Sequence, residues 1–198
     1  MYIYTRLLGN HFHIPDSICK YLISGILFFI ILFIIPQQTH AQRVAARTNA
    51  MQWAAASPNL GLEFALGNYF TLECTAGACP FRVMDKWYFK HLHVQPELKY
   101  WFQNLMSRNY VGITAFVSTF DLAMGKRAAY GDAYAVGATY GYQWVISRRW
   151  NIELAAGLGV IHHRTVRYTP GREHGKPNQS GWAFAPVKLG VSFMYILK

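Results

Sequence analysis

The sequence predicts an all-β fold: an eight-stranded antiparallel transmembrane β-barrel with up-and-down meander topology, preceded by a cleaved signal peptide. Three observations predict it. An apolar run near the N-terminus is typical of an export signal, later segments alternate apolar with small or polar residues, and short links alternate with longer ones. With 16% aromatic and 14% charged residues, the composition favours strands and membrane interfaces over a charged helical bundle. We therefore expect a signal peptide over residues 1–41 and one domain over residues 42–198.

The apolar run covers Tyr21–Ile35 and follows Lys20. Its length falls short of the roughly 20 apolar residues that a transmembrane helix needs. Thr39 and Ala41 place small residues three and one positions before Gln42, which fits a signal-peptidase site. A retained membrane anchor is the alternative.

Eight later segments show period-two alternation, with an apolar face opposite a small and polar one. The first of them is the weakest. They are Arg43–Met51, Asn59–Leu66, Tyr69–Thr75, His91–Phe102, Tyr110–Ser118, Tyr134–Val145, Trp150–Val160 and Pro186–Ile196. Eight is the smallest even number of strands usual for bacterial outer-membrane barrels.

The links between these segments favour the same architecture. Short links such as Gly67-Asn68 alternate with the longer segments Ala78–Lys90, Asp121–Asp132 and Tyr168–Gly181, as short periplasmic turns alternate with long external loops. Aromatic residues gather beside the short links, which predicts a belt at one membrane interface. A soluble sandwich with aromatic corners is the alternative. The predicted belt residues are Tyr69, Phe70, Tyr100, Trp101, Phe102, Tyr110, Tyr142, Trp144 and Trp150.

The polar faces of the segments carry few charges, fewer than the solvent face of a soluble barrel would carry. We expect these faces to line the interior, which in an eight-stranded barrel holds little more than side chains. Buried ions need partners, so the acids and bases should pair and leave no channel. The candidates for this interior ion-pair network are Arg47, Glu63, Glu73, Glu97, Lys99, Glu153 and Lys188.

The charge of the exported part indicates its partners. Removing residues 1–41 takes away Arg6 and Lys20 against Asp16, so 17 basic and 8 acidic residues remain, a net charge of +9. Because the chain is exported, no nucleic acid is expected; outer-membrane lipid and lipopolysaccharide are, with a surface glycan or a protein partner as alternatives. A basic segment offers a candidate anion-binding loop, although scattered loop charge without a ligand is the simpler interpretation. Its residues are Arg164, Arg167, Arg172 and Lys176.

Cysteine and histidine give no definite site. Cys74 and Cys79 remain after processing, and whether they form a disulfide depends on geometry that the sequence does not supply. His91 and His93 share a strand face, but a metal site needs three or four converging ligands, and solvated histidines are the simpler interpretation. The remaining histidines considered are His162, His163 and His174.

Catalytic motifs are equally weak. Ser180, His174 and Glu173 lie on one long segment, but their spacing does not mark a catalytic triad. The sequence carries no phosphate loop, nucleotide fingerprint or zinc-finger spacing. We therefore assign no catalytic residue, no cofactor and no metal ligand, and we expect the protein not to be an enzyme.

Several motifs occur in the order found in a known family. They are Arg-Thr-Asn at 47–49, Pro-Asn-Leu-Gly-Leu-Glu at 58–63, Lys-Trp at 86–87, Gln-Pro-Glu-Leu-Lys-Tyr-Trp at 95–101, Tyr-Gly-Tyr-Gln-Trp at 140–144 and Arg-Trp-Asn-Ile-Glu at 149–153. Over residues 44–198 the chain resembles a Bacteroidetes family of small secreted proteins, classed as a domain of unknown function and regarded as outer-membrane barrels. The resemblance implies a fold and an outer-membrane location but no activity. The Cys74/Cys79 pair and the non-aromatic C-terminus depart from the usual pattern.

Three functions from different classes stay open at this point. The leading one is a structural or surface-interaction scaffold that displays basic external loops. The second is loop-mediated binding of anionic glycan or lipopolysaccharide, and the third is a lipid-modifying outer-membrane enzyme.

The first prediction concerns processing. Because a small-residue cleavage motif follows the apolar run, the mature chain should begin at Gln42. N-terminal sequencing of protein extracted from membranes checks this, and recovery of an intact Tyr21–Ile35 segment would contradict it.

Overall fold

The computed structural model describes residues 43–79, 82–84, 87–125, 127–169, 175 and 177–197. The chain divides into two units, and all of these residues belong to the second, Ala41–Lys198. The predicted signal peptide lies outside the described residues. Among the residues described, no helix has the length and hydropathy needed to cross a membrane.

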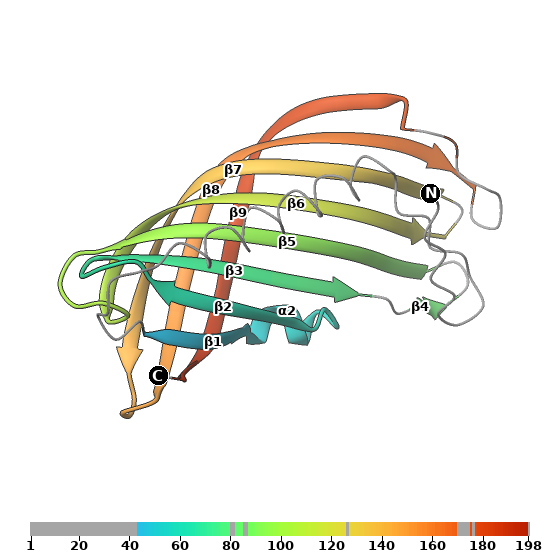
Figure 1. Cartoon of the computed structure of the whole chain (residues 1–198). Coiled ribbons are helices and arrows are strands. Elements are labelled where there is room, and N and C mark those ends of the chain that lie inside the picture. The colour runs from blue at the N-terminus through green and yellow to red at the C-terminus, as the bar shows by residue number, and fades with distance from the viewer. Residues whose placement is uncertain are drawn as a thin grey trace, which may run out of the picture. The chain divides into compact units, whose positions relative to one another are not determined.

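Within the described residues, eight antiparallel strands form one closed ring (Figure 1). Each pairs with its neighbour in the chain, and the last pairs with the first. The predicted eight-stranded meander is therefore confirmed. The ring consists of β1 (Val44–Asn49), β2 (Asn59–Ala65), β3 (Phe70–Cys79), β5 (Trp87–Trp101), β6 (Arg108–Met124), β7 (Arg127–Val145), β8 (Trp150–Tyr168) and β9 (Gln179–Ile196). A short strand, β4 (Arg82–Met84), pairs with β5, and a helix, α2 (Ala50–Ala54), joins β1 to β2.

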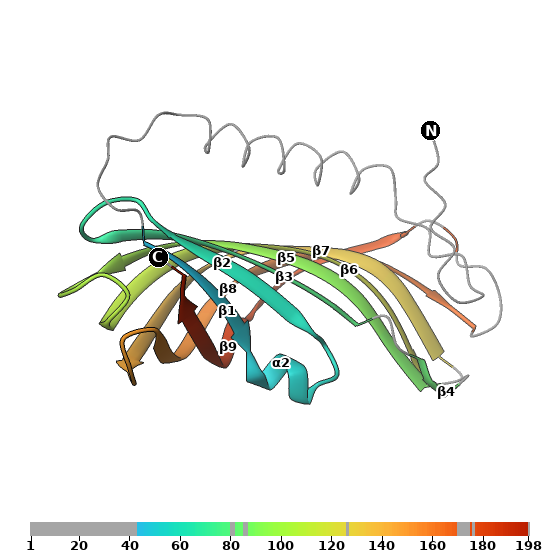
Figure 2. The ribbon, with the colours of Figure 1, turned by 60° about the horizontal axis from the view of Figure 1, so that its bottom comes forward.

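The ring has two unlike edges. The links β2–β3, β5–β6 and β7–β8 lie at one edge, which we call the short-turn edge; they are at the left of the ring in Figure 2. The helix α2, which joins β1 to β2, lies at the opposite edge, which we call the α2 edge. In an antiparallel meander each strand reverses direction, so every second link lies at the same edge.

The strands run further toward the α2 edge than the alternation predicts. β6 continues to Met124 and β7 begins at Arg127, so most of the predicted loop Asp121–Asp132 is strand; in the predicted loop Tyr168–Gly181, Tyr168 belongs to β8 and residues 179–181 belong to β9. The strand ladder continues there, but both faces carry polar or aromatic side chains. Period-two alternation of apolar and polar residues therefore disappears before the strands end.

The first predicted strand, Arg43–Met51, extends two residues too far at its C-terminal end and one at its N-terminal end. The strand ends at Asn49, whose side-chain oxygen accepts a hydrogen bond from the backbone N–H of Met51 at 2.9 Å. This is an N-cap, and the helix α2 follows it directly. Asn59 fixes the turn, since its side chain accepts from the N–H of Asn49 at 2.7 Å and donates to the Asn49 carbonyl at 3.0 Å.

The two faces of the ring are distributed as the sequence predicts. Outward apolar side chains are well exposed, for example Leu60 at 65% and Ile113 at 66%, whereas inward Glu63, Lys99 and Glu153 are 0% exposed. This is the reverse of a soluble protein, in which charged side chains are the ones exposed.

Exposed aromatic rings lie beside the short-turn edge, as predicted. They contact one another, for example Phe70 and Tyr100 with ring centroids 5.2 Å apart and Tyr100 and Phe102 at 5.6 Å; the half-buried Tyr142 lies 4.7 Å from Trp144. Two of the predicted belt residues point inward instead: Trp101 and Tyr110 are fully buried. Their parity in β5 and β6 places both on the inner face, which a reading of aromatic clustering alone overlooks. The other predicted belt residues with at least 38% exposure are Tyr69, Phe70, Tyr100, Phe102, Trp144 and Trp150.

Candidate functional site

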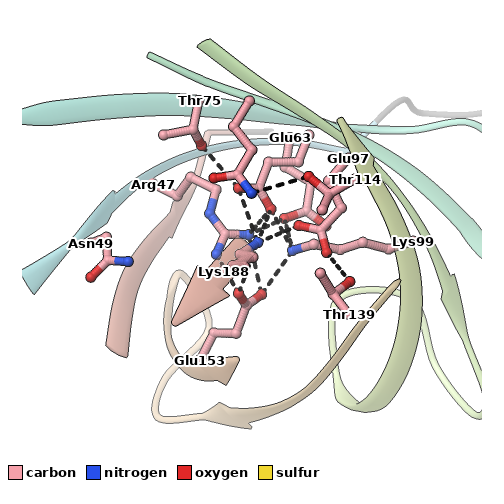
Figure 3. Close-up of polar contacts among 12 residues, drawn as sticks. Arg47, Asn49, Glu63, Thr75, Glu97, Lys99, Thr114, Thr139, Glu153 and Lys188 are labelled. Atoms are coloured by element: carbon pink, nitrogen blue, oxygen red, sulfur yellow. Dashed lines mark hydrogen bonds and ion pairs between the residues drawn. The ribbon is translucent and has the colours of Figure 1, made fainter. Parts of the chain in front are cut away.

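Seven charged side chains meet inside the ring, and they are the seven singled out from the sequence (Figure 3). They come from six of the eight strands of the described ring. Each side chain is at most 8% exposed. They are Arg47, Glu63, Glu73, Glu97, Lys99, Glu153 and Lys188.

Two of the cations share the same three carboxylates. Lys99 Nζ lies 3.1 Å from Glu63, 2.7 Å from Glu73 and 2.8 Å from Glu153. Arg47 lies 2.8 Å from Glu63 and 2.6 Å from Glu73, and it also pairs with Glu153 through both guanidinium nitrogens. Because charges alternate in space, each ion has opposite charges as its nearest neighbours. That arrangement compensates the loss of water around buried ions.

The third cation extends the network toward β5. Lys188 Nζ pairs with Glu97 and lies 3.2 Å from Glu73 and 3.9 Å from Glu153. Glu97 also accepts a hydrogen bond from the Thr139 hydroxyl. Glu97 thus has a single cationic partner among the described residues, whereas Glu153 has three.

Hydroxyl groups complete the network. Thr71 donates to Glu63 at 2.6 Å, and Thr75 donates to Glu73 at 2.9 Å. Oxygens of Glu63, Glu73 and Glu153 all lie within 4.8 Å of one another, a spacing that could hold a metal ion. Arg47 and Lys99 already contact all three, so these carboxylates have their counter-charge within the chain.

An apolar cluster closes the ring on the short-turn side of the network. Trp101, Met106, Tyr110 and Met194 pack together there, each at most 2% exposed. The link β5–β6 supplies Met106, whose carbonyl accepts hydrogen bonds from Gln143 at 2.7 Å and from Asn151 at 3.1 Å. The ring of Tyr110 also lies under Lys99, with the ammonium 4.5 Å from its centroid. We call this cluster the plug.

A cavity of about 320 Å³ lies on the other side of the network, toward α2. Its lining includes Arg47, Glu73 and Lys188, so the ion-pair network forms the end of the cavity that faces the short-turn edge. The cavity therefore ends blindly within the ring.

The two strand-face histidines line this cavity. His91 and His93 stack with centroids 5.5 Å apart, between Phe89 and Phe116. His91 Nε2 is 2.8 Å from the Ser57 hydroxyl. The structure thus places both histidines inside the ring rather than in solvent. Of the other histidines, His162 stacks on Trp182, His163 lies in β8, and His174 lies outside the described residues.

The comparison with known families agrees with the sequence motifs. A family model described as "Protein of unknown function (DUF3575)" matches residues 26–197. The chain belongs to this family. The expected membership in a family of unknown function is confirmed, although the match begins within the apolar run rather than at residue 44. The description names no bacterial group, location or activity. None of the curated proteins compared with the chain matches it.

The two cysteines of this family member do not form a disulfide. Cys74 and Cys79 are both free. They lie five residues apart in β3, which separates their Cα atoms by roughly 16 Å at about 3.3 Å per residue and turns their side chains to opposite faces. A disulfide requires Cα atoms about 4.4–6.8 Å apart. The extension of β3 to Cys79, which the sequence did not reveal, therefore excludes the bond.

Part of the predicted anion-binding loop is strand. Arg164 and Arg167 lie in β8. Arg164 is paired, with a guanidinium nitrogen 2.8 Å from Asp132, and Arg167 is exposed. Arg172 and Lys176 lie outside the described residues, as do Glu173 and His174 of the weighed catalytic set, while Ser180 is exposed in β9.

The unequal partner numbers of two glutamates make a prediction about stability. Glu153→Gln removes the charge that faces Arg47 and Lys99 together, and loss of a buried partner costs about 3–5 kcal/mol. Glu97→Gln should cost less, because it affects the one cation Lys188, which keeps Glu73 at 3.2 Å, whereas Glu153 has three cationic partners. Urea unfolding of the two variants in detergent micelles measures the order. An equal or reversed order would show that partner number does not set the stability of the network.

Proposed function

We propose that this protein is a small outer-membrane β-barrel that acts as a structural or surface-interaction scaffold rather than as an enzyme. The observation that supports the proposal is the inverted distribution of side chains on a closed ring: apolar residues face outward, and paired charges fill the interior. A lipid bilayer favours that distribution because its core holds no water to solvate outward charges, and closed strand ladders leave no backbone group unpaired there.

The outward band has the dimensions that a bilayer requires. In β8, exposed apolar and aromatic positions run from Trp150 through Leu154 and Leu158 to Val160. Ten residue steps span about 33 Å along a strand, or about 25 Å along the barrel axis at a tilt near 40°. An apolar band of about 25 Å is usual for outer-membrane barrels. The exposed aromatic rings at the short-turn edge would then rest among the lipid headgroups.

The interior supports a scaffold rather than a pore. The plug and the ion-pair network follow one another along the ring axis, and the cavity ends at the network. An eight-stranded ring has little room beyond its own side chains. The charged groups inside link the strands to one another through ion pairs. The ring would then be a rigid scaffold for the basic loops at the α2 edge.

Leu154 tests the membrane part of this proposal. It lies on the outer face of β8 and is 48% exposed. An arginine at a mid-membrane, lipid-facing position costs roughly 2–4 kcal/mol. Leu154→Arg should therefore fold poorly into lipid vesicles, whereas Leu154→Ala should fold nearly as well as wild type, as measured by heat-modifiable migration on a gel. A water-exposed position would tolerate both changes, so equal folding of the two variants would contradict a membrane-embedded ring.

Conductance tests the closed interior. Wild-type protein in planar bilayers should show no appreciable ion current, because the plug and the network block the axis of the ring. Stable single channels from the pure protein would overturn both the closed interior and the preference for a scaffold.

A further inference from the structure

Four exposed arginines lie at the short-turn edge. Arg43 precedes β1, with its carbonyl bonded to the N–H of Ala65 at the end of β2. Arg108 begins β6, and Arg148 and Arg149 lie in the link β7–β8. They are spread around the ring, because β1 and β6 are four strands apart in either direction. The β2–β3, β5–β6 and β7–β8 links that mark this edge can be followed in Figures 1 and 2.

The described residues at this edge include no acidic side chain. The four interior glutamates face into the ring, and Asp121 and Asp132 lie toward the α2 edge of β6 and β7. Within the described part of the chain, none of the four arginines forms a salt bridge, whereas Arg164 near the α2 edge pairs with Asp132 at 2.8 Å. Among the described residues, the short-turn edge therefore carries positive charge that no acidic side chain of the same edge compensates.

One of the four arginines, Arg149, is held beside the aromatic rings of this edge. Arg149 donates a hydrogen bond to the hydroxyl of Tyr195 at 3.0 Å, and the rings of Tyr195 and Trp150 lie edge to face with centroids 4.9 Å apart. Amphipathic aromatic rings rest at the headgroup level of a bilayer. A guanidinium bonded to such a ring lies at the depth of the lipid phosphates.

We propose that the short-turn edge binds the headgroups of anionic phospholipids. This inference rests on the proposed function, since it requires the ring to sit in a bilayer. A planar guanidinium donates two parallel hydrogen bonds to a phosphate, and a basic residue beside an anionic membrane surface strengthens binding about fivefold. The lipids of a bilayer surround the ring on all sides. Arginines at several points of the circumference therefore suit such lipids better than a single ligand bound at one point. By contrast, Arg164 and Arg167, two of the basic residues singled out from the sequence, lie in β8 near the α2 edge.

Lipid selectivity measures this directly. The protein is refolded into phosphatidylcholine vesicles that contain either brominated phosphatidylglycerol or brominated phosphatidylcholine, and quenching of tryptophan fluorescence reports the lipids in contact. Trp144 and Trp150 are exposed beside the short-turn edge and serve as reporters in a background in which Trp53 and Trp182, which are also exposed, are replaced by phenylalanine. We expect phosphatidylglycerol to be preferred by about three- to fivefold, and the preference to vanish in 1 M NaCl, where the screening length is about 3 Å.

Matched variants locate the effect. Arg148→Gln with Arg149→Gln should reduce the preference, and adding Arg43→Gln and Arg108→Gln should abolish it. The control, Arg127→Gln with Arg167→Gln, removes two exposed arginines near the α2 edge and should leave the preference unchanged. Insertion without a preference for phosphatidylglycerol, or loss of the preference in the control, overturns this inference alone. Failure to insert into either vesicle overturns the proposed function and this inference with it.

Discussion

The whole ring depends on the ion pairs that Arg47 of β1 and Lys99 of β5 form with the same three carboxylates in its interior. Glu63 and Glu73 lie on the strands between these two cations, whereas Glu153 lies on β8 and reaches Arg47 only when β1 pairs with β9 and the ring closes. A buried ion without a partner costs several kcal/mol, and that cost makes closure and charge pairing one event. The register follows from the same constraint, because a slip of one residue would turn a carboxylate from the interior to the outer face.

Room for these side chains comes from glycine on the inner faces. A Cβ at Gly112 would lie 2.8 Å from a Glu97 oxygen and 2.6 Å from the Thr139 hydroxyl. At Gly61 it would lie 2.4 Å from the Thr75 hydroxyl and 3.0 Å from Arg47. The small residues that alternate with apolar ones in the sequence are therefore part of the packing of the network. A narrow ring holds seven long charged side chains only where facing positions are left nearly empty.

The alternation of apolar and polar residues was enough to predict the ring and the seven interior charges, because each inward position keeps its parity along a strand. Parity alone also explains the two aromatic residues assigned to the wrong face, Trp101 and Tyr110. The sequence could not show where strands end beyond the apolar band, since pairing continues there without alternation. Because the strands extend further than the alternation predicts, Cys79 and Arg164 both lie in strand rather than in loop. Nor could it show the plug, since Met106 enters the ring from a link.

Because the interior balances its own charges almost completely, recognition has to occur elsewhere. Inside the ring, four carboxylates face three cations, while the chain as a whole carries a formal net charge of +10. In the described part of the chain, exposed arginines lie near the strand ends, outside the ring interior: Arg43, Arg108, Arg127, Arg148, Arg149 and Arg167. Charge placed there acts through a thin aqueous layer and is screened within about 8 Å at physiological ionic strength. Its partners must then lie in immediate contact with an edge of the ring, and in a bilayer the groups in that position on every side are the headgroups of the lipids.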